Sequence, residues 1–193
     1  MSLDLLKQNI TKNVQLNDSD LETFSNAFYP KTIAKKKFLL KQGEICNFEG
    51  FVTKGCFRVF TLDSQGKEHV LYFAIKDWWI TDIDSFTNQN KSILSIQAIE
   101  DSEALLITHE NKEQLYQQIP SIEKLFRIMT QKTLVSLQRR MISNLSQTAD
   151  DRYLNFITKY PQIAQKLTNL QLASYLGISH EFLSKIRSKT VSK

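Results

Sequence analysis

The chain contains few of the residues that interrupt regular structure, with 5 glycines and 3 prolines among 193 residues. This scarcity excludes a collagen-like chain and a low-complexity chain rich in proline and glycine. The two cysteines, Cys46 and Cys56, cannot form a disulfide scaffold. No apolar run approaches the roughly 20 residues that a membrane-spanning helix requires. These absences favour a globular protein with no membrane partner.

The N-terminus also lacks a secretory signal, because residues 1–16 have no basic start, long apolar stretch and small-residue cleavage site in succession. We therefore expect a cytoplasmic protein. Hydrophobic residues make up 41% of the chain and charged residues 23%, which is enough to bury a core. A length of 193 residues corresponds to one large domain or two small ones.

Charge is distributed unevenly along the chain. Residues 1–119 carry 13 basic and 16 acidic side chains, whereas residues 120–193 carry 12 basic and 4 acidic ones. The basic character therefore lies wholly in the C-terminal part, although the whole chain has a net charge of +5. Such asymmetry indicates a polyanionic partner for one end, and the alternative is a basic helix face that only meets water.

Residues 31–108 have the pattern of a β-rich domain. Short segments rich in Val, Ile, Phe and Tyr alternate there with turn residues. The segment Asp63–Gly66 predicts a hairpin, because Asp or Ser opens a turn and Gly accepts a positive φ at its end. Regularly spaced short strands favour a barrel or a jelly roll.

Helical patterns flank this region. Residues 2–28 are expected to be helical, with Asn17 or Asp18 able to cap a segment. Thr108 is a candidate cap, after which the pattern is helical to the end. A long helix is predicted over 120–145, with Pro120 in its first turn.

The apolar stripe of this long helix is wider than one core needs. We expect one side to pack on the barrel and the other to pair with a second copy of the chain. The alternative is a helix buried inside a monomer. The residues expected at the dimer contact are Leu125, Ile128, Met129, Val135 and Ile142.

The polar segment 146–151 is the expected boundary before a last unit. We therefore divide the chain into a β-rich domain (residues 1–119), a long helix (120–145) and a last helical unit (146–193). In the last of these, residues 168–189 read TNLQLASYLGISHEFLSKIRSK. Thr168 can cap one helix, Gly177 can end it in the left-handed conformation, and Ser179 can cap the next. This order is typical of a helix-turn-helix motif, with Phe182, Leu183 and Ile186 on the inner face of its second helix.

The outward side chains of that second helix can reach DNA, because the start of such a helix enters the major groove. The alternative is an ordinary helical hairpin with a solvated charged face. The predicted base contacts are His180, Glu181 and Lys185. The predicted phosphate contacts, which position the protein but do not specify sequence, are Thr168, Ser179, Ser184, Arg187 and Lys189.

These features together resemble the Crp/Fnr family of transcription regulators. The matching segments are GFVTKGCFRVFTLDSQGKEHVLYF, the long helix from Pro120, and LASYLGISHEFLSKIRSK. The resemblance implies an α+β fold: a jelly-roll-like β-roll sensor that resembles a cyclic nucleotide-binding domain, a long dimerisation helix and a C-terminal helix-turn-helix of winged-helix type. It also implies a homodimer on double-stranded DNA with an inverted-repeat operator, and contact with RNA polymerase. No room for a wing follows the second helix before Lys193, so we expect the wing to be truncated.

At the positions of the family's nucleotide pocket, this chain differs from the family pattern. Family members hold cyclic nucleotides with a Gly-Glu pair and an Arg-Ser-Ala run, and this chain has Ile80-Thr81 or Thr81-Asp82 in the first place and Ser92 near the arginine. Without that guanidinium, tight binding of cAMP or cGMP is not expected. A different small-molecule effector, of unknown identity, could use the altered pocket, or the aromatic residues could simply fill the core. The candidate pocket residues are Trp78, Trp79, Thr81, Asp82, Phe86, Lys91 and Ser92.

No cofactor is expected, since two cysteines cannot ligate an iron–sulfur cluster within one chain and a lone His69 or His109 is a weak basis for haem ligation. A cupin-like metal enzyme is the enzymatic alternative, but the histidines form no H-x-H pair. We therefore expect no enzyme activity and no metal site. A protein-interaction module that binds no DNA is the remaining alternative, and the salt dependence of binding would distinguish it.

Overall fold

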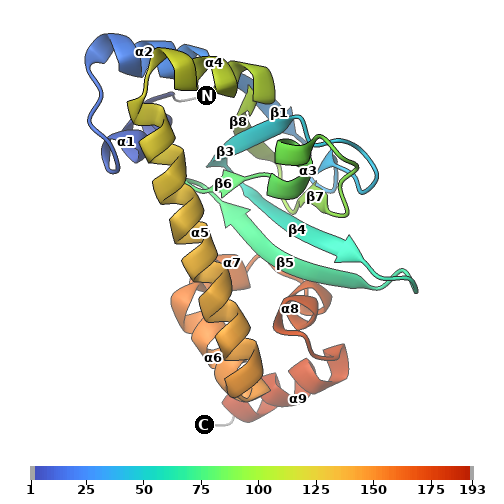
Figure 1. The fold of residues 1–193 in the computed structure, drawn as a ribbon. Helices are drawn as coiled ribbons and strands as arrows, with labels where there is room; N and C mark the ends of the chain where they lie inside the picture. The colour runs from blue at the N-terminus through green and yellow to red at the C-terminus, as the bar shows by residue number, and fades with distance from the viewer. Residues whose placement is uncertain (1–2, 192–193) are drawn as a thin grey trace.

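The computed structural model describes residues 3–191 and consists of a β-roll and a C-terminal group of helices, which one long helix connects (Figure 1). The strands are β1 (Tyr29–Ile33), β2 (Phe38–Leu40), β3 (Phe48–Lys54), β4 (Cys56–Leu62), β5 (Glu68–Ile75), β6 (Trp79–Ile80), β7 (Ser95–Ala98) and β8 (Ser102–Thr108). The helices are α1 (Leu3–Thr11), α2 (Asp18–Asn26), α3 (Ile83–Asn88), α4 (His109–Gln118), α5 (Ser121–Ser146), α6 (Ala149–Lys159), α7 (Pro161–Ala164), α8 (Asn169–Leu176) and α9 (His180–Val191).

The strands form two antiparallel sheets, in the orders β1-β8-β3-β6 and β2-β7-β4-β5. The predicted hairpin at 63–66 joins β4 to β5, where Leu62 pairs with Glu68. Within the second sheet β5 lies at an edge, so one side of its backbone is not paired with another strand. The predicted α+β class with a jelly-roll-like domain is confirmed.

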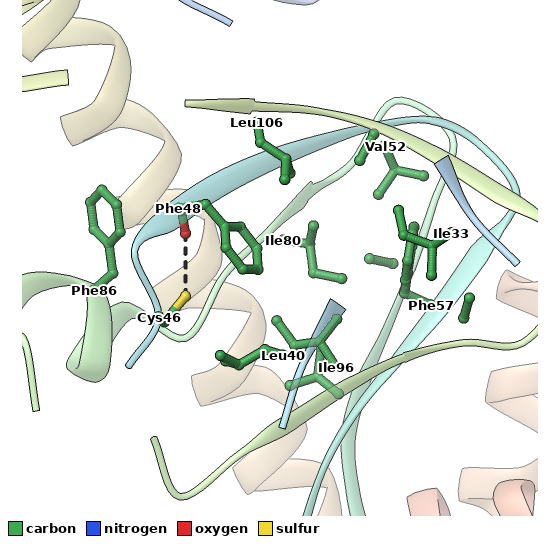
Figure 2. Close-up of a cluster of buried hydrophobic side chains, with 14 residues drawn as sticks. Ile33, Leu40, Cys46, Phe48, Val52, Phe57, Ile80, Phe86, Ile96 and Leu106 are labelled. Carbon is green, nitrogen blue, oxygen red and sulfur yellow. Dashed lines mark hydrogen bonds between the residues drawn. The ribbon is translucent and has the colours of Figure 1, made fainter. Parts of the chain in front are cut away.

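Apolar side chains from both sheets fill the interior of the roll (Figure 2). Phe57 and Ile96, of the second sheet, are completely buried, and Phe48 and Leu106 meet them from the first sheet. Burial of such side chains contributes about 1.5–3 kcal/mol each, so this core stabilises the roll.

A second apolar cluster lies between the first sheet and the N-terminal helices. Leu6 of α1, Phe24 of α2 and Phe126 of α5 pack there against Phe51 of β3. The region predicted to be helical over 2–28 forms two helices. The predicted cap at Asn17 is confirmed at the start of the second one, where its Oδ1 accepts a hydrogen bond of 2.8 Å from the backbone N–H of Asp20.

Helix α5 begins and ends within one residue of its predicted bounds. The prediction for Leu125 was wrong: this side chain is completely buried in the chain's own core and cannot reach a second copy. Ile128 and Met129 are half-buried, and Val135 and Ile142 are exposed. Large exposed apolar side chains continue along the second half of the helix, at Leu134, Leu137, Met141 and Leu145. No helix within residues 3–191, α5 included, combines the length and apolar character that crossing a bilayer requires.

A third cluster joins the roll to the C-terminal helices. Phe73 of β5 packs against Phe156 of α6 and Tyr175 of α8, with ring centroids 6.3 and 5.4 Å away. The hydroxyl of Ser174 accepts from the N–H of Val70 and donates to the carbonyl of Glu68. Helix α8 therefore covers the unpaired edge of β5.

Arg140 of α5 completes this junction. Its guanidinium donates to the carbonyls of Val70 and Leu71 in β5 and of Tyr175 in α8, and it lies 4.3 Å from the centroid of the Tyr175 ring. Burial lowers the pKa of Arg140 from its ordinary value, but a guanidinium remains charged at physiological pH. The long helix, the β-roll and the segment of α8 thus meet at one side chain.

Both thiols are buried, and we expect them to resist chemical modification in the native protein. Burial raises the pKa of Cys46, and it raises that of Cys56 to about 12. Since the thiolate is the reactive form, the rate at pH 8 should fall about a thousandfold for Cys56 relative to a free thiol with a pKa of about 8.5. Titration with Ellman's reagent should detect no fast thiol before unfolding and two after it; a fast thiol in the folded protein would contradict this.

Candidate nucleic-acid interface

The short helix α8 is defined at its start by a capping box. The side chain of Thr168 accepts from the N–H of Gln171 at 3.2 Å, and the side chain of Gln171 accepts in return from the N–H of Thr168 at 3.0 Å. Leu172, Ala173 and Leu176 are buried on its inner face. The predicted cap at Thr168 is confirmed.

A tight turn follows α8. Gly177 adopts a left-handed conformation with φ of 68°, which a residue without Cβ takes at low cost. The N–H of Ile178 then donates to the carbonyl of Ala173 at 3.1 Å and closes the helix end. The turn directs the next helix, α9, away from α8, as Figure 1 shows.

Ser179 caps α9, because its hydroxyl accepts from the N–H of Phe182 at 3.1 Å. Leu183 and Ile186 are buried, as the sequence predicts, and hold α9 against the rest of the unit. The expectation for Phe182 was wrong: its side chain is 43% exposed, because the helix turns it away from the inner face.

The three predicted base contacts all lie on the exposed side of α9. His180, Glu181 and Lys185 are exposed, and His180 and Glu181 stand in its first turn. Hydrogen bonds from the N–H of Glu181 itself and from the hydroxyl of Ser179 lower the pKa of the Glu181 carboxyl. That carboxylate is therefore charged at neutral pH and held at the N-terminal end of the helix, where the helix dipole favours negative charge.

The predicted phosphate contacts surround this face. Thr168, Arg187 and Lys189 are exposed, whereas Ser184 is half-buried. Arg187 donates to the side-chain oxygen of Asn169 at the start of α8, which orients its guanidinium. The hydroxyl of Thr168 already accepts a backbone hydrogen bond, so it retains its proton for donation. The hydroxyl of Ser179 accepts from the N–H of Phe182 and donates to the Glu181 carboxylate in the free protein.

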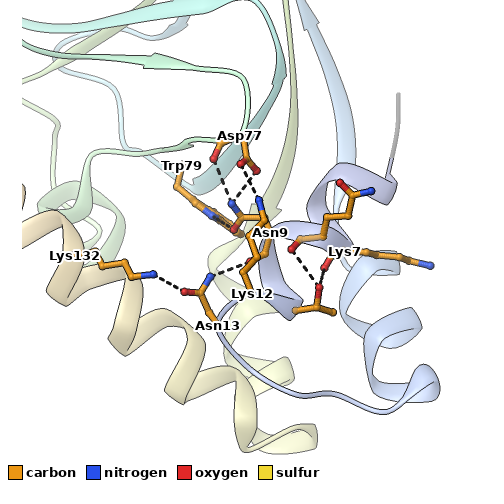
Figure 3. Close-up of polar contacts among 9 residues, drawn as sticks. Lys7, Asn9, Lys12, Asn13, Asp77, Trp79 and Lys132 are labelled. Carbon is orange, nitrogen blue, oxygen red and sulfur yellow. Dashed lines mark hydrogen bonds and ion pairs between the residues drawn. The ribbon is translucent and has the colours of Figure 1, made fainter. Parts of the chain in front are cut away.

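The candidate effector residues do not surround one common pocket. Trp79 fills the second apolar cluster, with its ring 5.3 Å from that of Phe51 and 5.7 Å from that of Phe126. Its Nε1 donates to Asn9 of α1 at 3.2 Å (Figure 3). Trp78 points elsewhere, into the seam between the roll and α6, where its ring lies 5.8 Å from that of Tyr160.

The remaining candidates stabilise the loop around α3. Asp82 is buried, and its carboxylate accepts from the hydroxyl of Ser92 at 2.5 Å. Thr81 donates to the carbonyl of Phe48, and Phe86 packs in the core of the roll. Lys91 is exposed. A buried carboxylate stands beside Ser92, where an anion-binding pocket would require positive charge.

The histidines are dispersed. His69 lies 2.9 Å from a carboxylate oxygen of Asp63, His109 contacts the ring of Phe86, and His180 belongs to α9. Within residues 3–191, no three His, Cys, Asp or Glu side chains come together as metal ligands.

Comparison with known proteins relates the chain to transcription regulators. Residues 30–119 match the family model described as the cyclic nucleotide-binding domain. The transcriptional activator protein Anr of Pseudomonas protegens is 22% identical over 168 residues, which cover 81% of this chain and 68% of Anr. Anr of Pseudomonas aeruginosa is 21% identical over 169 residues, which also cover 81% and 68%.

Solved structures show the same fold. FixK2 from Bradyrhizobium japonicum superposes with a TM-score of 0.76 at 17% identity, covering 86% of this chain and 85% of FixK2. The c-di-GMP-responsive global regulator CLP of Xanthomonas campestris gives a TM-score of 0.74 at 17% identity, covering 91% and 92%.

Proposed function

We propose that this protein, a homologue of Anr with the fold of the Crp/Fnr regulators, is a sequence-specific DNA-binding transcription regulator. The premise is that residues 30–119 form a cyclic nucleotide-binding domain. It acts as a homodimer in the cytoplasm, with RNA polymerase as a further partner and no enzyme activity. The observation that carries this proposal is the helix-turn-helix of α8, Gly177 and α9, with an exposed polar face on α9.

In this proposal α9 enters the major groove with its first turns. Lys185 can donate to guanine O6 and N7, and Glu181 can accept from cytosine N4, so these two side chains with His180 read base edges. Arg187 and Lys189, with the hydroxyls of Thr168, Ser179 and Ser184, contact the backbone. Phosphate contacts add affinity and fix the position of the protein on the duplex, but they do not specify the sequence.

The second half of α5 supplies the dimer contact. Leu134 and Met141, seven residues apart, are 63% and 64% exposed, and Leu145 is 78% exposed. An apolar stripe with this spacing pairs well with a copy of itself around a two-fold axis. Val135 and Ile142 flank the stripe, and Ile128 and Met129 lie at its half-buried start. The axis places the two copies of α9 about 34–36 Å apart, one turn of DNA.

The β-roll acts as the sensor, with an effector other than cAMP or cGMP. The buried pair of Asp82 and Ser92 supports this part of the proposal, because a cyclic phosphate would meet a carboxylate there. No cofactor is part of it. The junction at Arg140 and Ser174 links the sensor directly to α8, so a change in the roll can alter the placement of the DNA-binding unit.

Selection of bound sequences from random duplex DNA tests the function. The expected result is an inverted repeat whose half-sites are about one helical turn apart. Affinity for the selected duplex should fall steeply with salt, at about −0.9 in log K per log salt for each phosphate contact. Failure to enrich any duplex, or a shallow salt dependence, would favour the protein-interaction alternative.

Two substitutions on α9 distinguish a base contact from a phosphate contact. Lys185→Ala is expected to weaken binding to the selected duplex by about 1–3 kcal/mol and to relax one base position. Arg187→Ala should weaken selected and random duplexes to a similar extent, because a phosphate contact carries no sequence information. Fluorescence anisotropy titrations on both duplexes measure the difference, and equal losses for Lys185→Ala on the two would refute its assigned role.

A further inference from the structure

A large cavity lies between the two functional parts of the chain. Its volume is about 630 Å³, which is in the range of small-molecule sites. Most of the wall comes from β5 and the turn that follows it, from α5 between Ile128 and Asn144, and from α6 and α8. It is therefore separate from the interior of the roll, where the family's nucleotide pocket would lie and where apolar side chains fill the space (Figure 2).

The charge around this cavity has one sign. The described residues that line it include five basic side chains and no Asp or Glu. The basic residues are Lys132, Arg139, Arg140, Arg152 and Lys159. Because low-dielectric walls concentrate the field of such a group, the cavity attracts anions.

These five basic side chains differ in how many hydrogen bonds they already make within the protein. The guanidinium of Arg140 is occupied by three carbonyls, and Lys132 reaches Asn13 of α1 at 2.6 Å (Figure 3). Arg152 donates through its terminal nitrogens to two backbone carbonyls, but its buried Nε has no hydrogen-bond partner. Arg139 and Lys159 are exposed, and Lys159 contacts only the face of the Tyr160 ring, at 5.1 Å, among the contacts described. Arg139 and Lys159 thus keep donors for a bound anion, and Arg152 adds positive charge beside them.

Aromatic rings form much of the remaining wall. Trp78 and Tyr72 come from the sensor, and Tyr160 and Phe156 come from the helices after α5. The hydroxyl of Tyr72 donates to the carbonyl of Thr81, which directs the polar end of this side chain into the roll. Flat apolar surfaces beside unpaired cationic groups fit a ligand that has a ring system as well as negative charge.

We propose that this cavity is a binding site for a small anionic molecule with an aromatic part. The cationic edge formed by Arg139, Arg152 and Lys159 holds the anion, and Trp78 and Tyr160 pack against the ring system. The cavity side of α5 carries Lys132, Arg139 and Ser143, at helical spacing, and Ile128 and Val135 border both this side and the dimer stripe, whereas Leu134 and Met141 do not line the cavity. Ligand binding is therefore compatible with a helix that pairs with a second copy.

A ligand seated there touches the sensor and the DNA-binding unit at once. Its binding free energy consequently depends on how the two parts are placed, so it can shift their equilibrium. This coupling rests on the proposed function; binding itself does not, and it can be measured without DNA.

A fluorescent pair of probes tests the site. The probe is 8-anilinonaphthalene-1-sulfonate, which is anionic, and its comparison is N-phenyl-1-naphthylamine, which lacks only the sulfonate. We expect saturable binding of one sulfonate probe per chain, with energy transfer from tryptophan that Trp78→Phe reduces. The neutral compound should bind about tenfold more weakly, as loss of a charge-assisted contact implies.

Matched variants locate the contact. Arg139→Gln should weaken the sulfonate probe about tenfold and leave the neutral compound unchanged. Arg127→Gln is the control, because Arg127 lies on the same helix, is exposed and does not line the cavity. Circular dichroism melting verifies that each variant is folded. Equal affinity for the two compounds, or loss of the probe with Leu134→Glu but not with Arg139→Gln, would overturn the proposal in favour of a purely apolar surface.

Discussion

Replacement of Leu134 by glutamate is expected to produce a folded monomer that binds the inverted-repeat operator at least about 100-fold more weakly, because the two half-sites no longer act together. Leu134 is 63% exposed in the single chain, so a charge costs little there until a second chain covers it. At the two-fold axis, two carboxylates would face each other in an apolar seam, which opposes association.

Sedimentation velocity and operator titration measure this effect, and a surface control separates it from general damage. Ile93 of the sensor is 65% exposed, almost the same as Leu134, but lies outside α5. Ile93→Glu should leave the dimer and the operator affinity intact. If Leu134→Glu remains dimeric, the second half of α5 is not the dimer contact.

Replacement of Gly55 by alanine is expected to destabilise the sensor by about 3 kcal/mol or more, since it combines an unfavourable backbone conformation with a clash. Gly55 stands between β3 and β4 with φ of 87°, and an added Cβ would lie 2.2 Å from Oγ of Ser102. The same Cβ would be 2.8 Å from the Cα of Ser102, so a change of the serine rotamer cannot relieve the contact. The chain must shift at the junction of the two sheets.

Gly66→Ala is the matched control. This glycine has a similar φ, 77°, in the hairpin between β4 and β5, but nothing lies within 4 Å of its added Cβ. Gly66→Ala should lower the free energy of unfolding only by the cost of the positive φ for alanine, about 1 kcal/mol. Urea unfolding of both variants measures the difference, and equal losses would mean that the contact with Ser102 is not rigid.

Local signals made the helix-turn-helix predictable. Thr168, Gly177 and Ser179 mark helix ends through hydrogen bonds that span three to five residues, so the sequence contains both partners of each contact. The hairpin before β5 is local in the same way. The direction of a side chain near a helix end was harder to predict: Phe182 is exposed, although it was expected on the inner face of α9.

The sequence by itself thus determined the order of the β-rich region, the long helix and the helix-turn-helix, the ends of α5 and α8, and the strong positive charge of residues 120–193. Only the tertiary structure decided which side of each element is covered. It buried Leu125, sent Trp78 and Trp79 into different clusters, and brought Arg140 to the edge of β5, about 70 positions away in sequence. No local pattern contains these outcomes, because they depend on the packing of segments that are distant along the chain, and the cavity beside α5 exists only where four such segments meet.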